Sequence, residues 1–429
     1  MPILVGVNLK ETFAHKGFRM SEDQKYKPLS PNEKAIRRLL RNRSAIFGIF
    51  VICLAVIIAL LGYGITPDST PDANDQVSEV ALKKPGFNIT LLKVRKNRSI
   101  EKQSFLKTIL FGQPNPNRLV PINSYEINED SIYIKVYQGE GAPGKAEQYH
   151  LVDVLYATSI EKPEIEYVDN QFRFSTVDGT SVDIPVSELR ERIEKKAIYI
   201  HVYYFGTDGY GRCLLSRLLI GVRISLSVGL VAVIISLSIG IFMGAVAGYL
   251  GGRVDDFIML IINTMWSIPT LLLVFALVLA LGRGFWQIFT AVGLTMWVDV
   301  ARIVRGQVLS LKNVQYVEAA QGFGFSAGRI IRRHILPNIL GPVMVIAAAN
   351  FAMAILIEAG LSYLGFGIQP PQPSWGTMLS ENYSFLLMGG NPFPAIVPGI
   401  AIMLMVLAFN LVGNGFRDAL DVKARLGTG

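Results

Sequence analysis

Few residues in this 429-residue chain have the types and spacing that chemistry needs. Residues 139–145 match the phosphate-loop pattern G-x-x-x-x-G-K, but Ala146 follows where a hydroxyl should hold magnesium. No histidine pairs with carboxylates or cysteines at metal-ligand spacing. The two cysteines, Cys53 and Cys213, can form neither a disulfide framework nor a four-thiolate metal site. The sequence therefore predicts no catalytic residue, no metal site and no cofactor, and any ATP hydrolysis is left to a partner.

A more informative pattern lies in residues 305–338, a basic segment between two apolar stretches. It predicts a short helix, a break at Gly324, and a second helix that starts near Ser326 and ends at Pro337. Two short helices with small side chains suit the docking of a cytoplasmic protein, whereas a solvated loop against lipid head groups would not need this punctuation. The candidate site residues are Glu318, Ala319, Ala320, Gly324 and Pro337.

Glu358 is the one acidic residue inside the apolar stretch 339–364. An acid within a membrane helix usually faces the interior of the bundle and has a function. Only a few residues separate Glu358 from the polar loop that begins at Gly365, so a place near the outer boundary of the membrane fits equally well. Both interpretations stay open.

Some other polar or small residues inside the apolar stretches could line a path for a transported solute. The polar and amphipathic ones are Asn263, Trp266, Trp297 and Asp299. Core packing and anchoring at the membrane interface fit them as well, so none is assigned as a ligand. The small ones recur at four-residue spacing: Gly240, Gly244, Gly248 and Gly252. These glycines predict close packing of this helix against a neighbour in lipid. The alternative is that they form a line of small residues along a substrate path.

The elements that must position these residues are membrane helices. The chain is 51% apolar and 17% charged, whereas soluble domains carry about 25% charged residues. A membrane helix needs roughly 20 mostly apolar residues. Six stretches qualify: 44–65, 224–250, 257–281, 285–304, 339–364 and 393–415. We predict an all-α polytopic membrane protein with six transmembrane helices, interrupted by an insert between the first two.

The net charge of +8 indicates the orientation of these helices. With the N-terminus inside, the short inner flanks hold 20 basic residues and the outer ones hold four, so both termini are expected in the cytoplasm. Residues 1–43 would be a cytoplasmic segment whose helix 30–43 has Ser30 as cap and a basic face suited to lipid head groups. Because the excess charge sits at these flanks, nucleic acid is not an expected partner.

Residues 66–200 form the insert and are expected on the extracytoplasmic side. Alternating residues at 132–136 and 172–175 predict strands, Asp178-Gly179 predicts a hairpin turn, and 187–196 predicts a charged helix. The insert is therefore predicted to be a small α+β module. Residues 201–429 would form the permeating core.

Several segments resemble one family. The order E-A-A, then Gly324, then L-P resembles the loop of permease subunits of binding-protein-dependent ABC importers. The run HILPN (334–338), and FGTDGYGRCLLSRLLIGVRISLSVGL (205–230) with Cys213 where Asp is usual, resemble the dipeptide and oligopeptide branch. EAGLSYLGFGIQPPQPSWGTML (358–379) and GNGFRDALDVKAR (413–425) resemble its outer loop and C-terminal tail. The likeness covers residues 30–65 and 201–425 and leaves the insert unexplained.

This resemblance implies a permease subunit in the inner membrane of a bacterium. Its implied partners are a second homologous permease in a heterodimer, two cytoplasmic ABC ATPase subunits, and an extracytoplasmic solute-binding protein that delivers di- or oligopeptides. The loop around Glu318–Gly324 would sit in a groove of one ATPase and couple nucleotide-driven closure to the helices. The chain itself would not be an enzyme.

Three alternatives remain open. A permease for nickel or another small solute shares much of the same pattern. An ion-coupled secondary transporter would need intramembrane acids and an inverted repeat, and only Glu358 and Asp299 are candidate acids. A signalling receptor would need a larger effector domain than the C-terminal tail offers.

Overall fold

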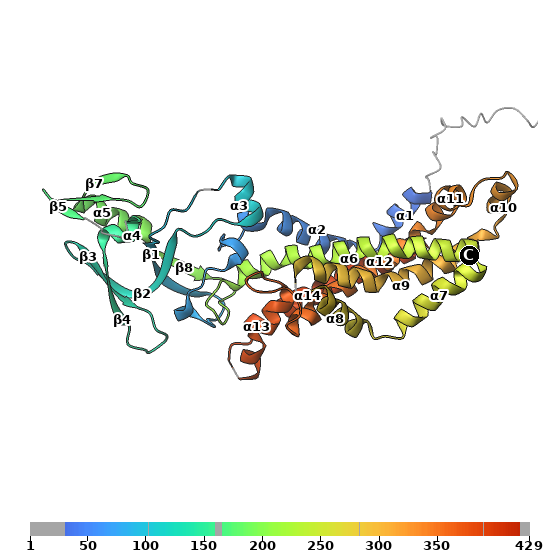
Figure 1. The fold of residues 1–429 in the computed structure, drawn as a ribbon. Coiled ribbons are helices and arrows are strands. Elements are labelled where there is room, and N and C mark those ends of the chain that lie inside the picture. Colours follow the sequence, from blue (N-terminus) through green and yellow to red (C-terminus); the bar gives the residue numbers. More distant parts are fainter. Residues whose placement is uncertain (1–30, 102, 159–164, 283, 389, 421–429) are drawn as a thin grey trace, which may run out of the picture.

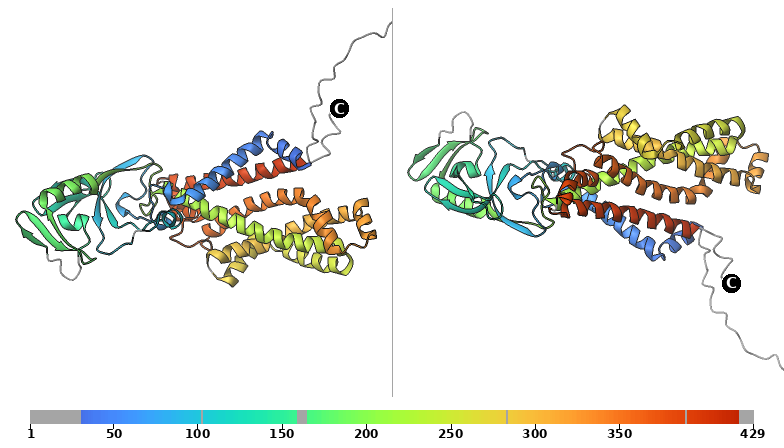
Figure 2. Two further views of the ribbon diagram at one scale, coloured as in Figure 1. Left: turned by 90° about the horizontal axis from the view of Figure 1, so that it is seen from above. Right: turned by 90° about the horizontal axis from the view of Figure 1, so that it is seen from below.

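The computed structural model describes residues 31–101, 103–158, 165–282, 284–388 and 390–420. The molecule is elongated, with β-strands at one end and a long helical bundle at the other (Figure 1). Two further views show the same division (Figure 2). Ser30, the predicted cap of the first helix, and the end of the C-terminal tail lie outside the described residues.

The helices of the bundle, with those that lead into it, have the following bounds: α1 (Pro31–Leu39), α2 (Arg43–Leu61), α6 (Leu214–Leu250), α7 (Gly252–Trp266), α8 (Thr270–Leu281), α9 (Phe285–Lys312), α10 (Gln315–Gly322), α11 (Ala327–Ile330), α12 (Leu336–Tyr363), α13 (Trp375–Leu387) and α14 (Phe393–Leu420). The strand-rich end contains α3 (Phe105–Phe111), α4 (Leu151–Leu155), α5 (Val186–Arg192), β1 (Phe87–Arg95), β2 (Asn117–Ile127), β3 (Ser131–Val136), β4 (Lys145–His150), β5 (Glu166–Val168), β6 (Gln171–Ser175), β7 (Ser181–Pro185) and β8 (Ile198–Tyr203).

In the part of the chain that the structure describes, the strands form two antiparallel sheets. The larger one has the order β4-β3-β2-β1-β8, so the last strand returns to pair with the first, with Thr90 opposite Ile200. The smaller sheet has the order β5-β6-β7, and its β6–β7 hairpin turns at Gly179, whose φ is +77°. The strands predicted at 132–136 and 172–175 correspond to β3 and β6.

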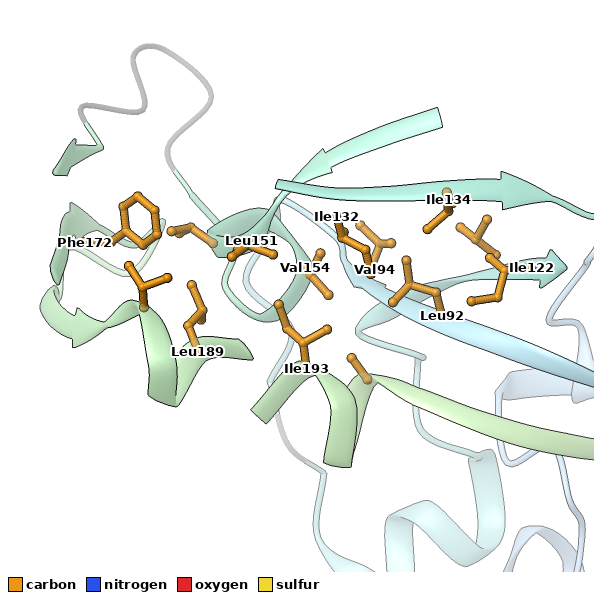
Figure 3. Packing of buried hydrophobic residues seen from close by; sticks show 14 of the residues in the cluster. Leu92, Val94, Ile122, Ile132, Ile134, Leu151, Val154, Phe172, Leu189 and Ile193 are labelled. Carbon is orange, nitrogen blue, oxygen red and sulfur yellow. The ribbon is translucent and has the colours of Figure 1, made fainter. Parts of the chain in front are cut away.

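One apolar core joins the two sheets. Alternate residues of β1 and β3, such as Leu92 and Ile132, point to the same face and pack against α4, α5 and the smaller sheet (Figure 3). Leu189 and Ile193 cover this face from the helical side. The period-two pattern that predicted these strands therefore selected the residues of the core.

The central contact of the bundle joins α6 and α9. Gly240 and Gly244 lie on this contact: a side chain at Gly240 would meet Val300, and one at Gly244 would meet the backbone of Ala301. Small residues here let the two backbones approach closely, as the four-residue spacing predicted.

Among the described residues, five helices are long and apolar enough to cross a membrane, or six if α7 and α8 count as one broken span. The prediction of one helix over 257–281 was wrong, because α7 and α8 are bent by 93° at the break. Pro269 has no N–H to donate and disfavours a helical conformation of the preceding Ile268. The Ser267 hydroxyl donates to the carbonyl of Asn263 at 2.8 Å, which satisfies part of the end of α7.

Several spans are longer than predicted, α6 and α9 most of all. α6 starts at Leu214 rather than at 224, and α9 runs to Lys312, into the segment 305–338 that was predicted to be a loop. The predicted stretches of mostly apolar residues ended next to Arg223 and Arg305. Both arginines are paired within the chain. Arg223 donates to three backbone carbonyls. Arg305 donates two hydrogen bonds to the carboxylate of Asp255, at 2.5 and 2.6 Å.

Candidate functional site

The element predicted to receive a partner lies at the end of the bundle farthest from the sheets, where α10 and α11 project (Figure 1). Val317 and Ala320 on one face of α10 are buried in an apolar cluster with residues of α9 and α12. Glu318 and Ala319 are exposed on the other face. Of the predicted contact residues of α10, two are thus open to a partner, and Ala320 packs inward.

Gly324 separates the two short helices as predicted. Its φ of +75° is in the left-handed region, and its N–H donates to the carbonyl of Gln321 at 2.9 Å. A Cβ at this position would meet nothing within 4 Å. The glycine is therefore required by the backbone conformation and not by a lack of space.

The prediction that the second helix ends at Pro337 was wrong. α11 continues through a π-helical turn, Ile331–Ile335, into α12, and Pro337 lies in the first turn of α12. In the π turn the N–H of Leu336 bonds to the carbonyl of Ile331. The wide turn lets the chain continue although the proline lacks a donor, and the start of a helix is where proline is tolerated. The segment after Gly324 is thus continuous with the long helix α12.

Sequence reasoning missed the aromatic residues of this element. Phe323 is 80% exposed beside Gly324. Phe325 stacks on His334, and the guanidinium of Arg329 lies 4.8 Å from the Phe325 ring centroid. The signal was available as two aromatic residues in a polar, basic loop. Phe323 thus adds a large exposed apolar side chain to the surface of this element.

A second polar cluster lies where the span formed by α7 and α8 is broken. The indole N–H of Trp266 donates to Asp299 at 3.1 Å, and the Arg302 guanidinium lies 3.7 Å from the Trp266 ring centroid. Arg302 also donates to Asn263 at 3.2 Å. The structure thus brings together three of the four candidates, while Trp297 is buried in apolar packing.

A cavity of about 460 Å³ opens beside this cluster. Its lining includes Trp266 and Asp299 together with Asn350, whose amide donates to the backbone of Met296 at 3.4 Å. Asn263 and Asp299 are exposed although they lie in or next to membrane-spanning helices. Polar groups are costly in lipid and normally face a bundle interior or a water-filled cavity. This face is therefore suited to water or to protein, not to lipid.

A network of buried charged residues lies at the end of the bundle that is near the sheets. Arg212 contacts Asp208 and Glu381, each at 2.6 Å, and Arg217 contacts Glu381 at 3.3 Å. Arg217 and Asp208 are each 1% exposed. Arg212 also donates to Asn74 of the insert at 3.3 Å. The network ties the start of α6 to α13 and to the insert.

Glu358 is fully buried near the end of α12. The Ser362 hydroxyl donates to its carboxylate at 2.6 Å. Ser362 is linked at 3.5 Å to Ser374, the residue that caps α13. The carboxylate therefore lies where α12 packs against the start of α13, inside the protein rather than at its surface.

The phosphate-loop match is part of a β-hairpin. Lys145 begins β4 and pairs with Glu147 at 2.8 Å, whereas a phosphate loop leads into a helix. Within the ranges that the structure describes, no group of three or more His, Cys, Asp or Glu residues could hold a metal ion.

Comparisons with known proteins match both ends of the chain. Residues 237–426 match the family model "Binding-protein-dependent transport system inner membrane component", and residues 30–85 match "N-terminal TM domain of oligopeptide transport permease C". Residues 86–236, which contain the strands, lie outside both matched ranges.

Curated relatives are similar over 223 residues, 52% of this chain. The oligopeptide transport system permease protein OppC of Bacillus subtilis is 42% identical over 72% of its length, and the dipeptide permease protein DppC of that organism is 44% identical over 69%. OppC of Escherichia coli is 44% identical over 73% of its length. A solved structure of the inward-facing MetNI methionine ABC transporter aligns with 48% of this chain at 18% identity and a TM-score of 0.40.

Proposed function

This chain belongs to the family of binding-protein-dependent transport system inner membrane components, and we propose that it is the permease subunit of an ATP-driven importer of di- or oligopeptides. The names of its relatives support the substrate class. The observation that carries the coupling role is the projecting α10–Gly324–α11 element, which is exposed on one side and continuous with α12 on the other.

Two ATPase subunits in the cytoplasm would drive this element. Glu318, Ala319 and Phe323 would enter a groove of one ATPase, and the turn at Gly324 would fix the angle between the two helices. Closure of the ATPases on nucleotide would then move α9 and α12 together, because α10 packs on both through its buried face. A two-state movement driven by ATP is what alternating access needs.

The remaining partners and the topology follow from the same assignment. The bent pair α7 and α8 would count as the third of six spans. Both termini would be cytoplasmic, and residues 66–200 would form an α+β extracytoplasmic module inserted between the first span and the core 201–429. An extracytoplasmic binding protein would deliver the peptide, and a second permease would complete the path.

The exposed polar face around the break between α7 and α8 would line that path. Asp299 and Arg302 lie one helical turn apart on α9, so a zwitterionic peptide could contact both. The bulk of the path would stay permissive, since peptide side chains vary while the backbone and termini are common to all substrates.

Reconstitution of the whole transporter tests this proposal. We expect proteoliposomes with both permeases, both ATPases and the binding protein to accumulate a labelled peptide only with ATP, and vanadate to abolish the uptake. Uptake of nickel but not of peptide would favour the small-solute permease. ATP-independent uptake by this chain alone would refute the assignment and indicate a secondary transporter.

For the coupling role, we expect Glu318→Cys to form a cross-link with an ATPase subunit, and the control Gln148→Cys in the β4 strand to form none. Equal cross-linking of both variants would contradict the docking site.

A further inference from the structure

The short helix α3 of the insert exposes an apolar surface. Four of its seven residues are large, apolar and exposed: Phe105 (77%), Leu106 (72%), Leu110 (55%) and Phe111 (64%). No residue of α3 is buried, so this helix adds nothing to the core of the insert. A surface of this kind on a folded module calls for a covering partner.

Arg223 fixes the position of α3 relative to the membrane helices. Its guanidinium donates to the carbonyls of Ile109 and Leu110 in α3 at 2.8 and 2.7 Å, and to the carbonyl of Ala59 in α2 at 2.6 Å. One side chain thus joins the end of α3 to the last turn of a membrane-spanning helix. Gly112 packs directly against Pro71, which leaves no room for a side chain there.

The exposed apolar surface of α2 continues onto α3. Near the end of α2 the exposed apolar side chains are Ile57, Leu60, Leu61 and Ile65, and α3 packs on the turn Gly62–Gly64 that follows them. α2 belongs to the most apolar of the candidate spans, and its buried residues are Ala45, Gly48 and Ala55. Figure 1 shows α3 beside this end of α2, at the junction of the insert and the bundle.

We propose that α3 lies in the outer lipid-water interface and anchors the insert to the bilayer. Seven residues rise only about 10 Å and cannot cross a core of about 30 Å. A short apolar helix held at the depth of a span's last turn can instead bury its side chains among the head groups. Exposed Lys107 supplies a cation that suits anionic head groups. The occupant of this surface is lipid, and the inference does not depend on which solute is transported.

Fluorescence quenching at single cysteines tests this placement. In the full chain with Cys53→Ala and Cys213→Ala, one cysteine is introduced and labelled with an environment-sensitive dye. Leu106→Cys tests α3, Leu60→Cys is the control for a lipid-facing position, and Tyr167→Cys is the control for an exposed position on β5. The labelled chains are measured in nanodiscs of phosphatidylethanolamine and phosphatidylglycerol, alone and in the assembled transporter.

We expect the label at position 106 to resemble the one at 60, in both preparations. Quenching by aqueous iodide should be several-fold weaker than at 167, and brominated lipids should quench the label at 106 but not the one at 167. Strong iodide quenching at 106 would overturn the proposal. Protection that requires the assembled transporter and is insensitive to brominated lipid would also overturn it, and would assign the surface to a protein partner.

Discussion

The two ends of the helical bundle differ in how far their side chains are buried and paired. At the end near the sheets, Arg212, Arg217 and Asp208 are at most 2% exposed, and they pair within the chain. At the far end, Glu318 and Phe323 are exposed. Removal of one member of a buried ion pair leaves an uncompensated charge, whereas exposed groups stay free to bind. The charged groups at one end are therefore paired within the chain, whereas Glu318 and Phe323 at the other end stay exposed.

Arg217→Met should give the largest change. The substitution leaves Asp208 and Glu381 with one cation fewer in a buried site, which costs about 3–5 kcal/mol of unfolding free energy. Denaturation of the purified chain in detergent measures this loss. The control, Arg173→Met, removes the exposed pair with Asp183 and should change stability little. Equal losses in the two variants would contradict the view that burial distinguishes this end.

Glu358→Ala should cost less, about 1–3 kcal/mol, because it leaves the Ser362 hydroxyl without its acceptor in a buried place. Glu358→Gln keeps an acceptor oxygen and should retain most of the stability and the transport rate. If the Gln variant folds normally but transport stops, Glu358 is a functional acid rather than part of the packing between α12 and α13.

Gly324→Val tests the turn between α10 and α11, at the end of the bundle farthest from the sheets. A non-glycine residue in the left-handed region costs about 1–2 kcal/mol, so the turn between α10 and α11 should shift while the bundle still folds. We expect loss of peptide uptake and of ATPase stimulation, with normal membrane insertion and normal ATPase association. Gly328→Val is the matched control, because a Cβ there also meets nothing within 4 Å and its φ is not in the left-handed region. Wild-type uptake in the Gly324 variant would remove the coupling role.

The smallest effect concerns pH and the insert. Burial lowers the pKa of His201, nearby Lys93 lowers it further, and Asp68 opposes both. Tyr199 and Tyr203 also face this ring. Because the unfolded chain takes up the proton first, stability should be intact above the ordinary histidine pKa of about 6.5 and fall as the pH decreases below it.

His201→Gln should flatten that pH dependence. Denaturation of the wild type and the variant at several values between about pH 7 and pH 5 measures the difference. The difference isolates His201 from Asp75, whose pKa is raised by burial and which acts in the opposite direction. An identical slope in both chains would show that His201 does not contribute.

Local patterns predicted much of this protein. The glycines of α6 predicted a close helix contact, which the packing of Gly240 and Gly244 against α9 confirms. The glycine at 324 predicted the break between α10 and α11. The prediction failed where charges or prolines were taken as helix ends, as at Arg223 and Pro337. The residue type alone does not show that the hydrogen-bond acceptors of Arg223, or the π turn before Pro337, make these residues acceptable inside a helix.

The sequence by itself determined the membrane class, the family and the segment that projects between α9 and α12, because apolar length, charge placement and turn residues act over a few neighbours. Only the tertiary structure decided which polar residues meet. Asp208 and Glu381 are far apart in the chain but share Arg212 and Arg217. Trp266 at the end of α7 likewise meets Asp299 of α9. Such contacts depend on how whole helices pack, which no local pattern encodes.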